Sequence, residues 1–138
     1  MRVFLDTNVL VSAFATRGLC ADVVRVVFAD PELITGEANL EELQRALRDR
    51  IKLPSPIIEA IRELLREQTV VPRPAGPASI AVRDQDDSVA LASAEAVNAD
   101  VLVTGDRDLL DVAQQSRIRI VSPRGFWELT RGGPALGK

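Results

Sequence analysis

Residues 3–14, VFLDTNVLVSAF, form an apolar run that the polar residues Asp6, Thr7 and Asn8 interrupt. The part before Asp6 is typical of a buried strand, and the part after Asn8 continues with helical periodicity. Three consecutive polar residues in such a run cost desolvation free energy unless something compensates them. The interruption is therefore either a turn or a functional site.

Outside this stretch, short apolar runs alternate with longer segments of helical periodicity. The expected strands are 2–6, 32–35, 69–72, 100–104 and 117–122. The expected helices lie within 9–30, where Gly18 separates two of them, and at 37–51, 55–68, 87–99 and 107–115. Strands separated by helices of about 10–15 residues predict an α/β fold with a mainly parallel sheet.

Composition places the chain among ordinary globular proteins. At 138 residues it fits one domain, which we expect at 1–130, followed by a disordered tail at 131–138. No segment approaches the roughly 18 consecutive apolar residues of a membrane span. The single cysteine, Cys20, cannot form an internal disulfide, and no leader-like segment precedes the first strand. We therefore expect a cytoplasmic protein without membrane contact.

Histidine is absent from the sequence, and the net charge is −3. The first fact excludes an imidazole base and a histidine-ligated zinc site. The second means that no overall basic field indicates nucleic-acid binding. Chemistry at a site in this chain has to come mainly from carboxylates.

Acidic residues follow two of the expected strands. Asp6 ends the first strand, and Asp106 follows the strand at 100–104. Because ligands bind at the carboxyl edge of open parallel sheets, both aspartates point to that edge as a site. Asp87 stands at the start of a small-residue helix, and Glu42 lies in the middle of 37–51.

Each of these acids also has an ordinary structural explanation. Aspartates at helix starts are common caps, which would explain Asp87 or Asp106 taken alone. Glu42 lies at the edge of its helix's apolar stripe, where a solvated acid is also expected. Asp6 differs, because the helix after it has no need of three consecutive polar residues. For Asp6 we favour a functional role.

Convergence of Asp6, Glu42, Asp87 and Asp106 on one cleft would raise their pKa values by mutual repulsion. A divalent cation removes that repulsion, and an all-oxygen set suits Mg²⁺ or Mn²⁺. One or two such ions held by carboxylates commonly hydrolyse phosphodiesters through metal-activated water. Polar residues suited to orient these acids are Asn8 and Thr104.

These residues resemble the PIN-domain family of nucleases. LDTNVLVSAF matches its opening pattern, NLEELQRAL resembles its helical glutamate motif at Glu42, and DQDDSVALASAEAVNADVLVTGDRDLL resembles its last two acidic motifs at Asp87 and Asp106. The resemblance covers essentially residues 2–127. It implies a three-layer α/β/α fold with a central, mainly parallel five-stranded sheet.

In function, the resemblance implies an Mg²⁺- or Mn²⁺-dependent endoribonuclease with one or two ions. The sequence is similar to stand-alone VapC-like toxins. This similarity implies a cognate antitoxin as a partner and a homodimer as the oligomeric state. The implied metal ligands and catalytic residues are Asp6, Glu42, Asp87 and Asp106, with Asp108 as a fifth candidate. Asp84 or Asp86 is an alternative to Asp87, and Glu41 is an alternative to Glu42.

Arginines near the expected loops and element ends are candidates to contact the RNA backbone. They are Arg17, Arg83, Arg107 and Arg124. For any single one of them, an exposed solubilising charge is the competing interpretation.

Two other functions compete with the nuclease. A haloacid-dehalogenase-like phosphatase also carries aspartates at strand ends, and GDRDLLD fits its last motif. That class needs a second aspartate where this chain has Asn8. A catalytically silent PIN-like binding module is the other alternative, although this chain has an acid at every motif position.

Overall fold

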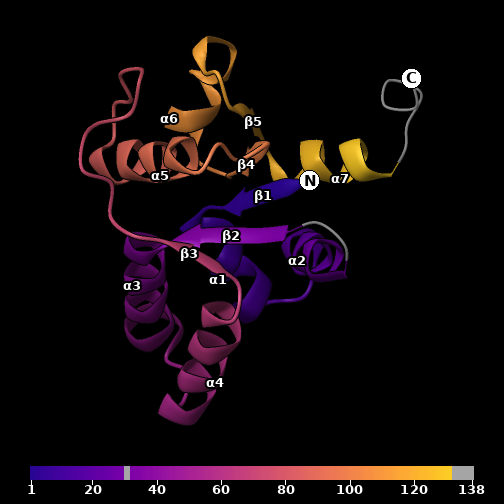
Figure 1. Cartoon of the computed structure of the whole chain (residues 1–138). Coiled ribbons are helices and arrows are strands. Elements are labelled where there is room, and N and C mark those ends of the chain that lie inside the picture. Colours follow the sequence, from indigo (N-terminus) through magenta and orange to yellow (C-terminus); the bar gives the residue numbers. More distant parts are fainter. Residues whose placement is uncertain (30–31, 132–138) are drawn as a thin grey trace.

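The computed structural model describes residues 1–29 and 32–131, which fold around a sheet of five strands (Figure 1). The sheet has the strand order β3-β2-β1-β4-β5, and every neighbouring pair is parallel. The strands are β1 (Arg2–Leu5), β2 (Glu32–Gly36), β3 (Thr69–Val71), β4 (Val101–Val103) and β5 (Arg119–Val121). The predicted α/β fold is confirmed, and the sheet is parallel in all its pairs rather than mainly parallel.

Helices cover both faces of the sheet, which gives three layers. On one face lie α1 (Thr7–Ala15), α2 (Leu19–Ala29), α3 (Glu37–Ala46), α4 (Ser55–Arg66) and α7 (Pro123–Thr130). On the other lie α5 (Gln85–Ala96) and α6 (Arg107–Leu110). Figure 1 shows α5 and α6 above the strands and α1 and α4 below them.

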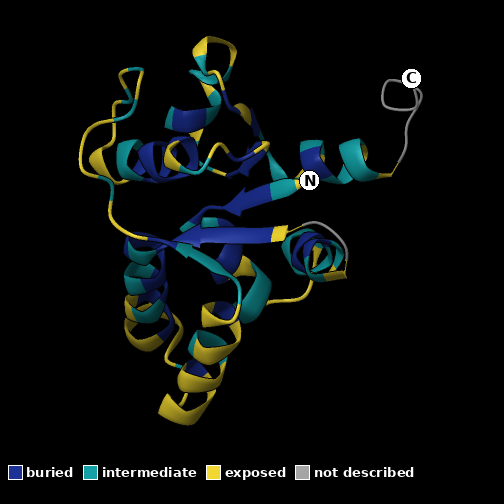
Figure 2. Cartoon of the chain, viewed as in Figure 1, coloured by how far each residue is buried: buried dark blue, intermediate teal, exposed yellow. Residues whose placement is uncertain are grey.

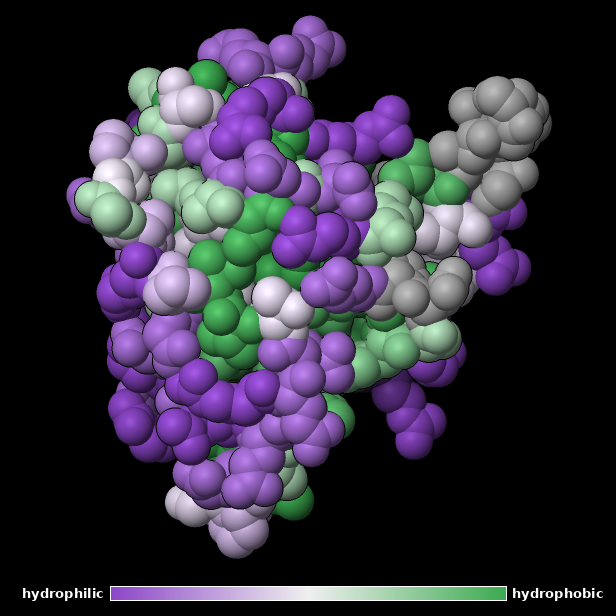
Figure 3. All heavy atoms as spheres, in the orientation of Figure 1, coloured by the Kyte–Doolittle hydropathy of each residue, from purple (hydrophilic) through white to green (hydrophobic). Residues whose placement is uncertain are grey.

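The alternation of side chains along β1 divides the core in two. Val3 and Leu5 pack with α1, α2 and α3, whereas Phe4 packs with α5. Successive residues of a strand point to opposite faces, so a strand covered on both sides has to be apolar throughout. Figure 2 shows the strands as the buried centre and exposed residues on the outer helix surfaces. Hydrophilic residues cover most of the face in Figure 3 and surround one hydrophobic patch near its centre.

Two local features bear on the predicted helices. Gly18, with φ of +144°, separates α1 from α2 as predicted. The segment predicted as one helix over 37–51 instead continues from α3 as a π-helical turn, Leu47–Ile51. Because a π turn contains more residues than an α turn, Ile51 is no longer aligned with Leu47. Leu47 is buried, whereas Ile51 is 39% exposed.

None of the helices in the described residues is both long and apolar enough to cross a membrane. The tail predicted to be disordered, 131–138, lies outside the described residues apart from Arg131.

Leu91→Ala should lower the free energy of unfolding by about 2–5 kcal/mol, because it leaves a cavity in the core. Leu91 of α5 is 0% exposed and lies in the same core as Phe4, Ile34 and Leu102. Urea denaturation measures the change. Leu64→Ala on α4 is the control, since Leu64 is 41% exposed, and it should change stability by no more than about 0.5 kcal/mol. An equal loss in both variants would mean that the outer face of α4 is covered in solution.

Candidate active site

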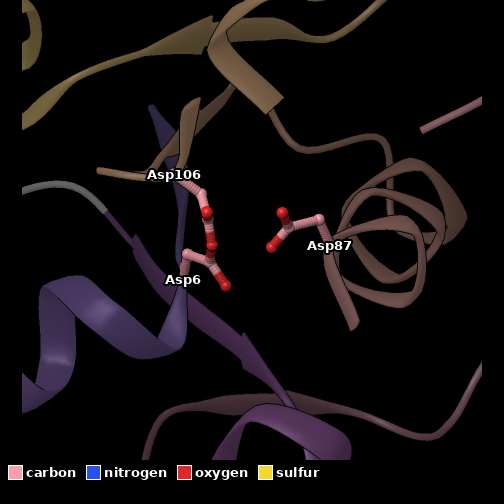
Figure 4. Close-up of side chains that lie close together, drawn as sticks. All are labelled: Asp6, Asp87 and Asp106. Carbon is pink, nitrogen blue, oxygen red and sulfur yellow. The ribbon is translucent and has the colours of Figure 1, made fainter. Parts of the chain in front are cut away.

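Three aspartates meet at the carboxyl edge of the sheet (Figure 4). Asp6 directly follows β1, Asp106 follows β4 and precedes α6, and Asp87 lies in the first turn of α5. One carboxylate oxygen of each lies within 4.8 Å of one oxygen of the others. Adjacent parallel strands end at the same edge, which explains why residues 100 positions apart come together. We call Asp6, Asp87 and Asp106 the three-acid cluster.

Both oxygens of Asp6 accept hydrogen bonds from the protein. Oδ1 accepts from the backbone N–H of Thr7 at 2.8 Å and from Nδ2 of Asn39 at 3.1 Å. Oδ2 accepts from Oγ1 of Thr104 at 2.8 Å and, more weakly, from Nδ2 of Asn8 at 3.5 Å. Asp6 is only 4% exposed, so these four donors replace the water that its carboxylate has lost.

Asn8 and Thr104 also connect Asp6 to Asp106. Oγ1 of Thr104 accepts from the backbone N–H of Asp106 at 2.9 Å. The side chain of Asn8 donates to Oδ2 of Asp106 at 3.4 Å and accepts from the backbone N–H of Gly105 at 2.9 Å. Each of these two side chains therefore contacts both acids and sets their relative orientation.

Asp87 differs from Asp6 in lacking such donors. Its Oδ2 is buried and has no hydrogen-bond partner among the described residues. Burial, followed by the hydrogen bond and negative charge of Asp106, raises the pKa of Asp87 to about 8. A buried carboxylate oxygen without a donor, facing two other carboxylates, is a good ligand position for a cation. The residues of the cluster therefore fit a divalent metal ion.

Burial also raises the pKa of Asp6, and the nearby charge of Asp106 raises it further. The hydrogen bonds from Thr104, Thr7 and Asn39 act in the opposite direction, because they stabilise the charged form.

Glu42 of α3 lies near the three-acid cluster but is not part of it. A pocket of about 220 Å³, which we call the acidic pocket, is lined by Glu42 and by all three aspartates. Oε1 of Glu42 accepts from Oγ1 of Thr7 at 2.9 Å. Among the described residues, the groups of acids with oxygens within 4.8 Å do not include Glu42. Burial and then the negative charge of Asp86 raise the pKa of Glu42. Glu41, its alternative, instead forms a salt bridge with Arg73 at 2.6 Å.

The neighbouring acids have different positions. Asp84 caps α5 by accepting from the backbone N–H of Asp87 at 3.1 Å. With Asp87 and Asp108 it forms a second group whose oxygens lie within 4.8 Å of one another. Asp86 lies on the side of the pocket that faces Glu42. Asp87 thus belongs to two acidic groups, which suits either one or two ions.

Asn39 and three arginines at the pocket were missed by sequence reasoning. Asn39 is 2% exposed and donates to both Asp6 and Thr7. Its position one helical turn before Glu42 is a signal that could have identified it, because residues three apart share a helix face. The arginines are Arg45, Arg50 and Arg73, which line the pocket or the cavities beside it.

The predicted RNA-contact arginines are scattered. Arg83 lines a large cavity beside the cluster, and Arg107 is the exposed first residue of α6. Arg17 follows the end of α1 that is far from Asp6. Arg124 lies on α7, 3.9 Å from Glu128.

Comparison with known proteins gives one family and one fold. The family model described as PIN domain matches residues 2–108. No curated protein matches the sequence. Among solved structures, VapBC2 from Rickettsia felis bound to a DNA fragment from their promoter is similar, with a TM-score of 0.65 and 16% identity. The match covers 88% of this chain and 98% of that chain. At that identity, the likeness shows the fold alone.

Without metal, the protein should lose stability as the pH rises from 5 to about 8. The pKa of Asp87 is about 8 in the folded chain but about 4 in an unfolded chain. Over this range the folded state holds a proton that the unfolded state has released, so stability falls with rising pH. The pKa values of Asp6 and Glu42 shift in the same direction.

The measurement is the thermal midpoint in EDTA at pH 5 and pH 8. Asp87→Asn should flatten the dependence, and millimolar Mn²⁺ should raise the midpoint at pH 8 by binding the native state. A wild-type midpoint that is higher at pH 8 than at pH 5 in EDTA would contradict the assignment of the raised pKa values.

Gly36→Ala should weaken Mn²⁺ binding by about tenfold, as expected when a residue behind a ligand is displaced. A Cβ at position 36 would lie 2.8 Å from Oδ1 of Asn39 and 3.3 Å from Oγ of Ser93. Asn39 would have to move away from Asp6. Calorimetric titration with Mn²⁺ tests this. Gly76→Ala is the control, because its Cβ would meet nothing within 4 Å, and unchanged binding in both variants would mean that Asn39 does not position Asp6.

Proposed function

The chain belongs to the PIN-domain family, and on that premise we propose that it is a metal-dependent endoribonuclease. One observation carries this proposal above the others. Asp6, Asp87 and Asp106 place oxygens within 4.8 Å of one another at the carboxyl edge of the sheet. With Oδ2 of Asp87 buried and without a donor among the described residues, the cluster has the ligand chemistry that hydrolytic Mg²⁺ and Mn²⁺ sites use.

In this proposal Asp6, Asp87 and Asp106 hold the first ion, and Glu42 is a further ligand on the α3 side. Asp84 and Asp108, with Asp87, are positioned for a second ion. Bound there, Mg²⁺ or Mn²⁺ lowers the pKa of a water molecule and neutralises charge on the phosphate.

The chain's own residues orient Asp6 and Asp106. The donors around Asp6 favour its charged form and restrict its rotation. Thr104 and Asn8 hold Asp106 beside it. The side-chain amide of Asn8 donates to both Asp6 and Asp106. A haloacid-dehalogenase-like phosphatase needs a carboxyl group at this position to transfer a proton, and an amide cannot transfer it. This contact favours the nuclease over the phosphatase.

The finer part of the proposal is that the protein is a VapC-like toxin. One solved structure with this fold is that of VapBC2, which supports an antitoxin as a partner of this chain. We propose that this antitoxin covers the acidic pocket. We also propose a homodimer. In this function RNA is the substrate, and the antitoxin is the regulatory partner.

Purified protein should cleave total cellular RNA in Mn²⁺ or Mg²⁺ and should not cleave it in EDTA. Asp6→Asn and Asp87→Asn should each lower the rate by on the order of a hundredfold or more, since loss of a ligand exceeds the loss caused by its supporting residues. Asp111→Asn is the control, because Asp111 is an exposed acid outside the cluster. Gel analysis of the RNA gives the rate, and circular dichroism checks the fold of each variant.

Three other results would each lead to a different conclusion. A raised thermal midpoint in Mn²⁺ without cleavage would indicate a silent binding module. A phosphorylated Asp6 trapped after incubation with a phosphate ester would indicate the phosphatase. Cleavage that persists in both variants would mean that the activity lies elsewhere or comes from a contaminant.

A further inference from the structure

A cavity of about 410 Å³ lies beside the acidic pocket, between the first turns of α5 and the loop at 73–83. We call it the loop pocket. Its volume falls within the range of pockets that bind small molecules, about 300–1,000 Å³, and a nucleobase with its ribose fits that range. The loop pocket is not part of the acidic cluster, and none of its lining residues has a role in holding the metal.

The lining of the loop pocket combines three kinds of group. Pro74, Pro77, Val82 and Val89 provide apolar surface, Gln85 and Ser88 provide hydrogen-bonding groups, and Arg73 and Arg83 provide positive charge. These three kinds of group match the three parts of a nucleotide, which are a flat apolar base face, a polar base edge and a phosphate.

The loop pocket and the acidic pocket share lining residues with a third cavity. A smaller cavity between them is lined by Glu42 and Asp86, which also line the acidic pocket, and by Arg73 and Val89, which also line the loop pocket. Arg45 lines this connection as well. An extended strand that places one phosphate at the acids can therefore pass Arg45 and Arg73 into the loop pocket.

Neighbouring residues at the start of α5 line different pockets. Asp84, Asp86 and Asp87 line the acidic pocket, whereas Gln85 and Ser88 line the loop pocket. The same helical turn that supplies acids to the cluster thus supplies hydrogen-bonding side chains to the neighbouring cavity. Movement of α5 would alter both pockets together.

The loop that forms the outer wall is fastened to the core. Glu95 of α5 is 7% exposed and accepts hydrogen bonds from both the backbone N–H and the hydroxyl of Ser79, the former at 2.9 Å. Ala78, Ile80 and Val82 of the loop pack against the core between α5 and the sheet. A pocket whose wall is already held in place loses less entropy when it binds a ligand.

Both arginines are accessible to a phosphate. Arg73 pairs with Glu41, but the two side chains are 57% and 45% exposed, so the pair is weak enough for a phosphate to replace the carboxylate. Arg83 is exposed and forms no salt bridge with the described residues.

We infer, on the basis of the ribonuclease function proposed above, that the loop pocket binds the nucleotide of single-stranded RNA next to the scissile phosphate. Arg73 and Arg83 contact the backbone, and Gln85 hydrogen-bonds the edge of the base. The loop pocket is then the part of the site that selects the base beside the cleaved bond.

The first test measures binding of fluorescein-labelled single-stranded RNA in the Asp6→Asn background with Mn²⁺. Adding Arg73→Gln and Arg83→Gln together should weaken binding by about tenfold or more, and should lower the slope of log K against log salt by about 0.7 for each phosphate that the protein no longer neutralises. Arg25→Gln with Arg48→Gln is the matched control, because it removes the same charge from side chains that are 73% and 64% exposed and do not line the loop pocket.

The second test compares binding of four RNA oligonucleotides, each with a different base throughout. The Asp6→Asn protein should prefer one or two bases, and Gln85→Ala should reduce that preference severalfold. Gln114→Ala, at an exposed position on the described surface, should leave it unchanged.

The outcomes separate the loop pocket from the ribonuclease. Binding that depends on Arg73 and Arg83, in a protein whose wild-type form cleaves no RNA, supports the pocket and overturns the ribonuclease. Cleavage by the wild type, with binding and base preference unaffected by the three loop-pocket variants, overturns the pocket alone. Absence of RNA binding in the Asp6→Asn protein and in all its variants overturns the pocket. If the Arg73 and Arg83 substitutions then weaken binding of a purified protein partner, the cavity is a protein-binding surface.

Discussion

Like charges held close together in a partly dry pocket are the constraint on which the rest of the site depends. Asp6, Asp87 and Asp106 have oxygens within 4.8 Å of one another, and the groups that donate to Asp6 are neutral amides and hydroxyls. Neutral dipoles orient a carboxylate and favour its charged form, but they do not cancel the repulsion between carboxylates. At Asp87, burial together with the hydrogen bond and negative charge of Asp106 raises the pKa to about 8. A bound cation would cancel the repulsion between the carboxylates that the protein's own donors do not cancel.

The scaffold explains how the acids come so close without unfolding the protein. Asp6 and Asp106 are fixed by neighbouring strands, and the backbone N–H of Asp6 donates to the carbonyl of Val103 in β4 at 3.0 Å. Asp87 depends instead on how closely α5 approaches the sheet. Its buried face contains Ala90 and Ala94, and small side chains at a contact shorten the distance between packed elements. The energy that compensates the repulsion comes from apolar burial in the two cores that flank the strands.

The fold and the aspartates could be predicted because each depends on local patterns. Strand and helix periods differ, and an aspartate directly after a buried strand in a parallel sheet has to lie at the carboxyl edge. The direction of a side chain on a helix is harder to predict. Glu41 and Glu42 differ by about 100° around α3, and only the packed structure shows that Glu42 contacts Thr7 while Glu41 contacts Arg73. Arg73 follows β3 in sequence, but its place at the pocket depends on the path of the loop, for which no periodic pattern exists.

The distribution of charge explains why metal and RNA would depend on each other in the proposed nuclease. Six acids and, among the described residues, one arginine line the acidic pocket, so this pocket repels a phosphate when no ion is bound. Arg45 and Arg73 line the adjoining cavity on the side of α3 and the loop. In the proposed nuclease, a strand of RNA would therefore meet less repulsion on the side of Arg45 and Arg73 than at the six acids, until bound cations reverse the sign there. The proposed antitoxin would face the opposite condition, because a basic side chain entering the acidic pocket gains most when the metal is absent. In the proposed function, the same six acids would make metal-loaded protein the form that binds RNA and metal-free protein the form that a basic partner binds most tightly.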